Sequence, residues 1–337
     1  MARAKAEVAA LIGAGGVSPG RLPCPTSLLV APATRSAVAA QALLEPKGAR
    51  MKIWLLSGLD PAGEHLARSI AASCPLDRIV RVVWPPPSRR RAGSARRRIS
   101  AMDAVSAVLR RGEQAWREHH TERLGRGAAS HLAAHDASLS MAAVAADTTV
   151  AAPLINGPEL AGELARCRPD LLVVHGAPVL HERVFGVPSS GTINVHYGIA
   201  PEYRGTSTLF WALYRRDFEH VGVTVHRVTS DLDGGPVLGH ALPKLRPDDD
   251  EAAVFAACAR VGADLVLAYL ERCRRGAAPA GVALPLGPPP HRKAERRIAH
   301  DVAYWWRRNV ARERLPARAA KVTLYGAVEA PPDAASR

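Results

Sequence analysis

Residues 170–176 have the sequence DLLVVHG, in which four consecutive aliphatic residues stand between polar ends. A continuous apolar run of this length is typical of a strand buried on both faces, as in a parallel sheet. Similar runs lie on either side of it, TINVH at residues 192–196 and MKIWLLSG at residues 51–58. RIVRVVW at residues 78–84 is a further strand, which Pro85 ends. Three more strands are expected at residues 149–155, 221–228 and 237–245.

Stretches with helical periodicity separate these strands. We expect helices at residues 64–74, 99–124, 159–167, 207–215, 250–272 and 295–314. Strands that alternate with helices predict right-handed βαβ crossovers. The expected fold is therefore α/β, a Rossmann-like, mainly parallel sheet with helices on both faces. Such a sheet binds ligands at the carboxyl ends of its strands. The loops at these ends are residues 56–63, 175–182, 196–206 and 229–236.

The composition is that of a globular protein. The chain has 337 residues, of which 47% are hydrophobic and 23% charged. We find no run of about 18 apolar residues, which argues against a membrane-spanning helix. The five cysteines are odd in number and lack paired spacing, which argues against a disulfide framework or a zinc ribbon. This cysteine usage predicts a reducing, cytoplasmic location.

The net charge of +14 is concentrated outside the expected sheet. Residues 1–50 carry a net charge of +4, residues 86–127 carry +7, and residues 274–337 carry +8. The rest of the chain is mildly acidic, with a net charge of −5. Only 5% of the residues are aromatic, whereas a nucleic-acid surface usually interleaves basic and aromatic side chains. This distribution indicates solvated arginine-rich segments, and makes a nucleic-acid partner the less favoured interpretation.

The densest cluster of polar residues follows the apolar strands. Asn194 and His196 are two residues apart on an expected strand, so they point to the same face. The turn SDLDGGP at residues 230–236 carries two carboxylates, those of Asp231 and Asp233. An amide, an imidazole and a carboxylate at one sheet edge can together catalyse acyl transfer, because they can stabilise an oxyanion and remove a proton from an amine. The alternative is a structural hydrogen-bonding pair at a strand end.

Several motifs occur in an order that resembles a known family. They are INGPE at 155–159, PDLLVV at 169–174, INVH at 193–196, PEYRG at 201–205, GVTVH at 222–226 and LDGG at 232–235. This series is similar to the signature of the 10-formyltetrahydrofolate-dependent formyltransferases, which include glycinamide ribonucleotide, methionyl-tRNA and sugar N-formyltransferases. The resemblance covers residues 51–272.

The resemblance implies roles for particular residues. Asn194, His196 and Asp233 would form the catalytic triad, while Asp231 matches no triad position. The binding site for 10-formyltetrahydrofolate, the formyl donor, would consist of Gly176, Ala177, Pro178, Val179, Leu180, Thr229, Ser230, Asp231, Leu232 and Asp233. The acceptor would contact Ser57, Gly58, Tyr197, Arg204 and Gly205. No metal is implied.

The resemblance also divides the chain. Residues 1–50 are expected to be a disordered extension, either a real tail or a stretch upstream of a start at Met51. Residues 51–272 would form the catalytic domain, with an arginine-rich insertion at about 85–147. Residues 273–337 would form a C-terminal segment with one helix, whose packing residues are Tyr304, Trp305 and Trp306. Related enzymes often pair through such elements, so a homodimer is possible.

Departures from the family pattern narrow the expected acceptor. The sequence HYG follows at residues 196–198 where many relatives have His-Pro-Ser, and TLFWALY at 208–214 is closer to the sugar and small-metabolite branches. The C-terminal segment lacks the alternating strand pattern of the barrel that methionyl-tRNA formyltransferases append, which argues against initiator tRNA. The expected acceptor is the primary amine of an amino sugar nucleotide or an amino acid-derived intermediate. The alternatives are a formyltetrahydrofolate hydrolase and a non-catalytic basic module that binds nucleic acid.

Histidines outside these motifs have simpler interpretations. His119, His120, His131 and His135 include a pair spaced four residues apart, but no carboxylate or cysteine completes a metal-ligand pattern, so solvated side chains are expected. His175 stands beside the expected folate loop. Contact with a ligand and packing at the strand end are equally consistent with its position.

Overall fold

The structure is a computed structural model that describes residues 50–84, 101–139, 147–285 and 287–326. Its centre is one eight-stranded sheet with the strand order β3-β2-β1-β4-β5-β6-β7-β8. The strands are β1 Ile53–Gly58, β2 Arg78–Val83, β3 Asp147–Ala151, β4 Leu171–His175, β5 Thr192–Tyr197, β6 Val223–Arg227, β7 Val237–Leu242 and β8 Lys321–Leu324. The pairs among β1 to β5 are parallel, and β6, β7 and β8 join by antiparallel pairing. The predicted fold class is confirmed.

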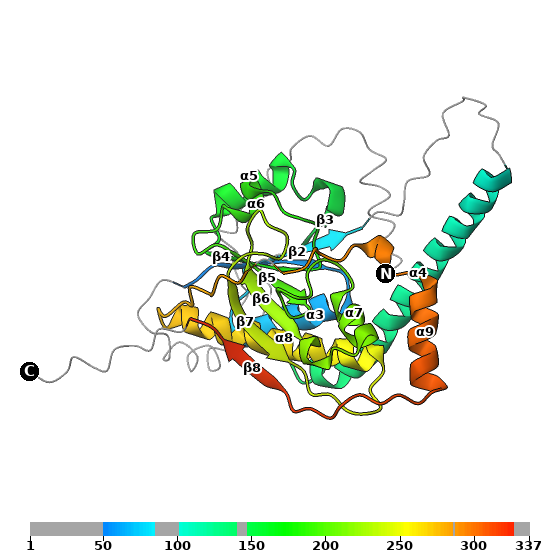
Figure 1. The fold of residues 1–337 in the computed structure, drawn as a ribbon. Helices are drawn as coiled ribbons and strands as arrows, with labels where there is room; N and C mark the ends of the chain where they lie inside the picture. Colours follow the sequence, from blue (N-terminus) through cyan, green and yellow to red (C-terminus); the bar gives the residue numbers. More distant parts are fainter. Residues whose placement is uncertain (1–49, 85–100, 140–146, 286, 327–337) are drawn as a thin grey trace, which may run out of the picture.

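Helices cover both faces of the sheet (Figure 1). They are α3 Pro61–Ser73, α4 Ala101–Asp136, α5 Pro158–Cys167, α6 Glu182–Phe185, α7 Thr208–Arg215, α8 Glu251–Arg274 and α9 Ile298–Asn309, with 3₁₀ turns at η2 Ala152–Leu154, η3 Phe218–His220 and η4 Lys293–Glu295. Successive residues of β1 show why two layers are needed. Ile53 and Leu55 pack into a core with α3 and α8, whereas Trp54 and Leu56 pack with Leu160 of α5 on the other face.

Helix α3 begins directly after β1 and lies close against it. Asp60 caps the helix, because its Oδ1 accepts hydrogen bonds from the backbone N–H groups of Ala62 (2.9 Å) and Gly63 (3.0 Å). Gly63 permits the close approach, since a Cβ there would lie 2.2 Å from Ser57 Oγ. As a result Ser57 is fully buried beneath the first turn of α3.

Helix α4 and the C-terminal segment from residue 273 differ from the helices predicted there. The helix expected at 99–124 continues to Asp136 as α4, and packs against α3 and α8 through Ala128 and Leu132. The C-terminal segment contains α9, which is shorter than the expected 295–314, and also β8, which extends the same sheet through β7. The segment from 273 is therefore more than one helix. Residues 1–49 and the arginine-rich stretch at 89–98 lie outside the described residues.

Helix α8 has the length and apolar composition that would allow a helix to cross a membrane. However, 72% of its most apolar stretch is buried inside the structure, where it packs against α3, α4 and the sheet. This burial is what the central helix of a packed core requires.

Candidate active site

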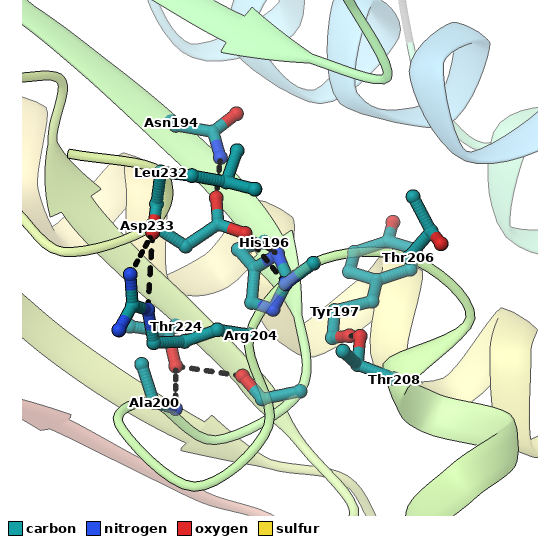
Figure 2. Close-up of polar contacts among 12 residues, drawn as sticks. Asn194, His196, Tyr197, Ala200, Arg204, Thr206, Thr208, Thr224, Leu232 and Asp233 are labelled. Carbon is teal, nitrogen blue, oxygen red and sulfur yellow. Dashed lines mark hydrogen bonds and ion pairs between the residues drawn. The ribbon is translucent and has the colours of Figure 1, made fainter. Parts of the chain in front are cut away.

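The site lies where β5 and β6 run side by side in the middle of the sheet. In their antiparallel register Asn194 is opposite His226, and His196 is opposite Thr224. These four residues share one face of the two-stranded pair because side chains alternate along a strand. The turn between β6 and β7 then brings Asp233 over that face (Figure 2). Asp233 has a φ of 47°, a left-handed conformation that directs its carboxylate back toward β5.

The three residues of the expected triad come together around the carboxylate of Asp233. Its Oδ2 lies 3.5 Å from His196 Nδ1, and its Oδ1 lies 3.5 Å from Asn194 Nδ2. The side chains of His196 and Asp233 are 8% and 9% exposed, so both are largely withdrawn from solvent. Residues 194 and 233 are far apart in the sequence, but the fold places the amide of Asn194 and the imidazole of His196 next to the carboxylate of Asp233.

His226 is a fourth member of this cluster. It ends the motif GVTVH at residues 222–226, but it was not predicted to belong to the site. Its Nδ1 lies 2.9 Å from the carbonyl oxygen of Arg227, so Nδ1 carries the proton and donates it. Its Nε2 is therefore an acceptor, and receives a hydrogen bond of 3.2 Å from Asn194 Nδ2. The signal in the sequence was the two-residue spacing of Thr224 and His226, which repeats that of Asn194 and His196 on the partner strand.

The charges in the cluster determine its protonation. Burial by itself would raise the pKa of Asp233, but His196, His226 and the N–H of Gly205 lower that pKa well below its ordinary value. Burial lowers the pKa of His196, and the opposing charge of Asp233 only partly compensates. At neutral pH the site therefore holds an ionised Asp233 beside a neutral His196.

The hydrogen bonds of His196 identify the nitrogen that is available for chemistry. Its Nε2 lies 2.8 Å from the carbonyl oxygen of Tyr203, a contact that requires a proton on Nε2. In the neutral ring Nδ1 then carries the lone pair, and it faces Asp233. An imidazole can polarise or protonate an oxyanion only through an N–H group, and this N–H is already bonded to the backbone. The free lone pair suits a general base instead.

The segment from Tyr203 to Thr206 holds the Asp233 turn in place. The guanidinium of Arg204 donates two hydrogen bonds to the carbonyl oxygen of Leu232, one of them 3.0 Å from Nε. The backbone N–H of Gly205 donates to Asp233 Oδ2 at 2.9 Å. Arg204 and Gly205 were expected to contact the acceptor. The structure places them as the residues that orient the turn carrying Asp233.

Replacing Gly205 by alanine is expected to reduce turnover at least tenfold and lower the melting temperature. Gly205 has a φ of +93°, and a Cβ there would lie 2.2 Å from the backbone oxygen of His291. The clash would displace the N–H that bonds Asp233. Gly276→Ala is the matched control, because Gly276 also has a positive φ of +72° but no atom lies within 4 Å of the added carbon. Melting curves and steady-state rates of Gly205→Ala and Gly276→Ala test this explanation. An equal loss of turnover in the two variants would contradict it.

A cavity with a volume of about 860 Å³ opens in front of the triad. This volume falls within the roughly 300–1,000 Å³ of small-molecule sites. The wall includes the triad, Tyr197, Gly205 and all ten residues of the expected folate site, namely 176–180 and 229–233. Ser57, Gly58 and Arg204 are absent from this wall. The first turn of α3 covers Ser57, so Ser57 does not reach this cavity, and an acceptor contact at Ser57 or Gly58 stays a prediction.

Other parts of the wall come from segments that sequence reasoning did not assign to a site. They are Trp84 after β2, residues 120, 121 and 124 of α4, residues 251 and 255 of α8, and residues 291–293 and 296 before α9. Trp84 is 64% exposed at this wall. Neither the insertion nor the C-terminal segment carries a recognisable motif, so only the folded chain shows that both reach the cavity.

Comparison with known proteins agrees with this geometry. A family model described as formyl transferase matches residues 126–270, a stretch that contains Asn194, His196 and Asp233. Residues 126–270 are thus similar to the formyl transferase family. It is 34% identical over 122 residues to a methionyl-tRNA formyltransferase of Halorhodospira halophila, covering 36% of this chain and 39% of that protein. It is 32% identical over 179 residues to one of Mycolicibacterium gilvum, covering 52% of this chain and 54% of that protein. The chain thus spans about half or less of these relatives.

Solved structures of formyltransferases are also similar. A sugar N-formyltransferase from Shewanella shares 13% identity at a TM-score of 0.41, over 71% of this chain and 76% of that one. A phosphoribosylglycinamide formyltransferase from Anaplasma phagocytophilum shares 16% identity at a TM-score of 0.43, over 68% of this chain and 89% of that one.

Within the matched residues 126–270, His175 ends β4 at the cavity wall and forms an ion pair with Asp60. Its Nε2 lies 3.3 Å from Asp60 Oδ1, and its ring is 5.2 Å from that of Tyr197. Burial would raise the pKa of Asp60, but His175 and the N–H groups of Gly63 and Ala62 lower it to about 2. Burial lowers the pKa of His175, but Asp60 outweighs this effect and raises it overall. The pair joins α3 to the edge of the site.

Replacing Asp60 by alanine is expected to reduce the free energy of unfolding at neutral pH by about 1 kcal/mol, the usual cost of losing an N-cap. The pKa of Asp60 is lowered from 3.8 to about 2 in the folded chain. Its ionised form therefore stabilises the fold above pH 3.8, and this contribution is lost as the pH falls toward 2. Urea titrations should show that the loss of unfolding free energy caused by Asp60→Ala becomes smaller as the pH is lowered from 3.8 toward 2. Asp60→Asn keeps the cap and serves as the control; an effect that is constant with pH would contradict the assignment.

The histidines of α4 have different environments. His119, His131 and His135 are exposed, as expected. His120 differs, since its Nε2 accepts a hydrogen bond of 2.7 Å from Arg296 and its side chain is 15% exposed. The described residues contain no group of three or more histidines, cysteines and carboxylates arranged for a metal ion.

Proposed function

We propose that this protein transfers the formyl group of 10-formyltetrahydrofolate to the primary amine of a small metabolite. The observation that carries the proposal is the convergence of Asn194, His196 and Asp233 on the wall of a cavity of about 860 Å³. All three residues lie in the stretch that is similar to the formyl transferase family. A neutral base, an ionised carboxylate and an amide N–H at one point meet the needs of acyl transfer to an amine.

The formyl donor is assigned to the part of the cavity between residues 176–180 and 229–233. These segments bring backbone polar groups together with two exposed apolar side chains, those of Val179 (60%) and Leu232 (41%). A flat heteroaromatic ring such as that of folate needs such a combination, because its faces are apolar and its edge forms hydrogen bonds. Asn156 fixes the first segment by donating to the carbonyl oxygen of Val179 (2.9 Å) and accepting from the N–H of His181 (2.7 Å).

The transfer proceeds by direct attack of the amine on the formyl carbon. As the new C–N bond forms, the formyl oxygen gains negative charge and the nitrogen becomes positive. Asn194 has one amide hydrogen on His226 and a second that faces Asp233 at 3.5 Å, a weak contact, so the second is the one offered to the oxyanion. His196 Nδ1 accepts the amine proton, and Asp233 stabilises the resulting imidazolium. The bond from carbon to N10 of the folate then breaks, and N10 takes the proton from His196.

The acceptor is assigned to the class of amino sugar nucleotides or amino acid-derived amines. Sugar N-formyltransferases are among the similar solved structures, including a putative one from Mycobacterium tuberculosis and one from Francisella tularensis described as a 4-N formyltransferase. The curated relatives are named for methionyl-tRNA, but the alignments cover only 39% and 54% of two of them. We therefore do not assign tRNA as the acceptor. A cytoplasmic location and a homodimer stay predictions.

The proposal is tested by measuring tetrahydrofolate release by absorbance, with 10-formyltetrahydrofolate and a panel of primary amines. The expected result is release that depends on an amine and yields the formylated amine in equal amount. Release at the same rate without any amine would identify a hydrolase and overturn the proposal. No release with any member of the panel, in a protein shown to be folded, would also contradict it.

A further inference from the structure

Helix α9 turns an apolar face away from the body of the protein. Asp301 and Tyr304, which point inward, are only 7% and 8% exposed. The apolar side chains on the outer side are exposed by 51% to 53%, and they are Val302, Trp305, Trp306 and, directly after the helix, Val310. Figure 1 shows α9 at the edge of the molecule beside α4. A surface helix normally points its apolar stripe toward the core, so the reversed arrangement of α9 indicates a face that a partner covers.

Polar contacts on the inner side hold α9 in this orientation. The carboxylate of Asp301 pairs with Arg296 at 2.7 Å and accepts a hydrogen bond of 3.1 Å from the indole N–H of Trp116 in α4. Near the other end, the guanidinium of Arg308 donates to the carbonyl oxygen of Asp249 at 2.8 Å. Rotation of the helix to bury its tryptophans would break the ion pair of a buried carboxylate, which is strongly unfavourable. The apolar face therefore stays outward.

Positive charge stands at both ends of this face. Arg297 precedes α9 and Arg312 follows it, and both residues are exposed. Neither forms an ion pair within 4 Å with a carboxylate of the described residues. The two carboxylates between residues 296 and 314 are already occupied, because Asp301 is in the ion pair described above and Glu313 pairs with Arg216 at 2.8 Å. A partner that covers the tryptophans thus meets cations whose charge is not neutralised locally.

The size and charge of the face distinguish between occupants. Two half-exposed tryptophans and two half-exposed valines offer on the order of 400 Å², since a whole aromatic side chain has about 150–250 Å². A stable dimer usually buries about 800 Å² on each partner. A two-fold axis would also bring the cations of one copy against those of the other, because both copies use the same surface. The valines offer no ring on which a base could stack, which argues against single-stranded nucleic acid.

We propose that the outer face of α9 binds the protein to the surface of a bilayer that contains anionic phospholipids. Tryptophan rings favour the boundary between headgroups and acyl chains, and arginines beside them are attracted to anionic headgroups. The helix has 12 residues, fewer than the roughly 20 needed to span a bilayer, so it lies along the surface. This inference goes beyond the proposed function and does not depend on it. Formyl transfer without vesicle binding would overturn this inference alone, and vesicle binding without transfer would overturn the proposed function alone.

The first test measures co-sedimentation of the full chain with vesicles of phosphatidylcholine alone and of phosphatidylcholine mixed with phosphatidylglycerol. Binding to the mixed vesicles is expected to be at least tenfold stronger. Trp305→Ser/Trp306→Ser should lower this binding at least tenfold with an unchanged melting temperature, because both rings are exposed. Trp84→Ser is the matched control, since Trp84 is 64% exposed but lies on the cavity wall instead of on α9, and it should bind as the wild type does. Absence of binding, or equal binding by the wild type and the serine double variant, would overturn the proposal.

The second test separates the cations of α9 from the net charge of the chain. Arg297→Gln/Arg312→Gln should weaken binding to the mixed vesicles at least fivefold and leave binding to phosphatidylcholine alone unchanged. Lys244→Gln/Lys321→Gln removes the same charge from exposed lysines beside β7 and β8, and should bind as the wild type does. An equal loss in the two double variants would assign the attraction to net charge and overturn the proposed site.

A third measurement keeps the proposal testable if the serine double variant does not fold. Brominated phosphatidylcholine in the mixed vesicles should quench the tryptophan fluorescence of the bound wild-type chain. Trp305→Phe/Trp306→Phe keeps two aromatic rings, so it should still bind, but the quenching should fall by more than half. Unchanged quenching would place other tryptophans in the bilayer and overturn the proposal. So would a face used by a second copy, seen as a dimer that dissociates in Trp305→Phe/Trp306→Phe without any vesicle binding by the wild type, or tighter binding to a poly-uridine strand than to the mixed vesicles.

Discussion

Replacement of Asp233 by asparagine is expected to reduce formyl transfer to near the background rate. The substitution keeps the shape of the side chain, and Gly205 can still donate to its oxygen. It removes the negative charge that stabilises the imidazolium formed at His196, and an amide N–H facing Nδ1 would donate to the lone pair that should accept the amine proton. In a serine protease triad the corresponding change costs about 10,000-fold in kcat. Single-turnover formation of the formylated amine measures this loss directly.

The control for this variant is Asp248→Asn, another change from aspartate to asparagine. The side chain of Asp248 is 80% exposed and pairs only loosely with Arg314 at 3.7 Å. The Asp248→Asn variant should therefore turn over at the wild-type rate. Turnover like that of the wild type in Asp233→Asn, with an unchanged melting temperature, would refute the role of the carboxylate in the proposed mechanism.

The strands and the site were predictable because each is encoded within a short stretch. A strand buried on both faces requires consecutive apolar residues whatever lies around it, and residues 171–174 and 53–56 meet that requirement by themselves. The site motifs end or follow such strands. The resemblance to the formyltransferases then implied Asn194, His196 and Asp233 as the triad, and the structure places Asn194 Nδ2 and His196 Nδ1 each 3.5 Å from the carboxylate of Asp233.

The extension of α4 beyond residue 124 and the strand β8 were not predictable, because their environment determines them. Most faces of α4 are polar, and its packing depends on small contacts such as Gly127, where a Cβ would lie 2.7 Å from that of Ala252 in α8. Strand β8 has four residues, and two of them are exposed. It is a strand because β7 presents an unpaired edge beside it, with Gly239 opposite Leu324. Neither contact leaves a periodic pattern in the sequence.

Ser57 and Gly58 lie outside the cavity wall for a related reason. Ser57 and Gly58 follow a predicted strand, where a ligand is usually bound, but the position of α3 decides whether they are accessible. Gly63 lets the helix approach until Ser57 is covered. Conversely, Arg292 and Lys293 reach the cavity because residues 204–206 hold His291 in place, a contact across more than eighty residues of chain.

Replacement of Asn194 by alanine is the second variant with a large expected effect. It removes the amide hydrogen assigned to the oxyanion, and the loss of one such donor costs about 100- to 1,000-fold in kcat. His226 Nε2 loses its donor, but His226 Nδ1 keeps its bond to the carbonyl oxygen of Arg227, so the fold should persist. The KM for the folate donor should change little, because the segments assigned to folate are untouched.

The comparison variant is Asn309→Ala, since Asn309 is exposed and donates only to the carbonyl oxygen of Trp305 at the end of α9. It is expected to keep wild-type kcat. The two assignments at residue 194 can be separated by the kinetic parameter that changes. A donor used only in the transition state lowers kcat and kcat/KM equally, whereas a residue that merely shapes the folate site raises KM at constant kcat. An Asn194→Ala chain with raised KM and unchanged kcat would therefore remove the amide from the mechanism and leave His196 and Asp233 as its only catalytic groups.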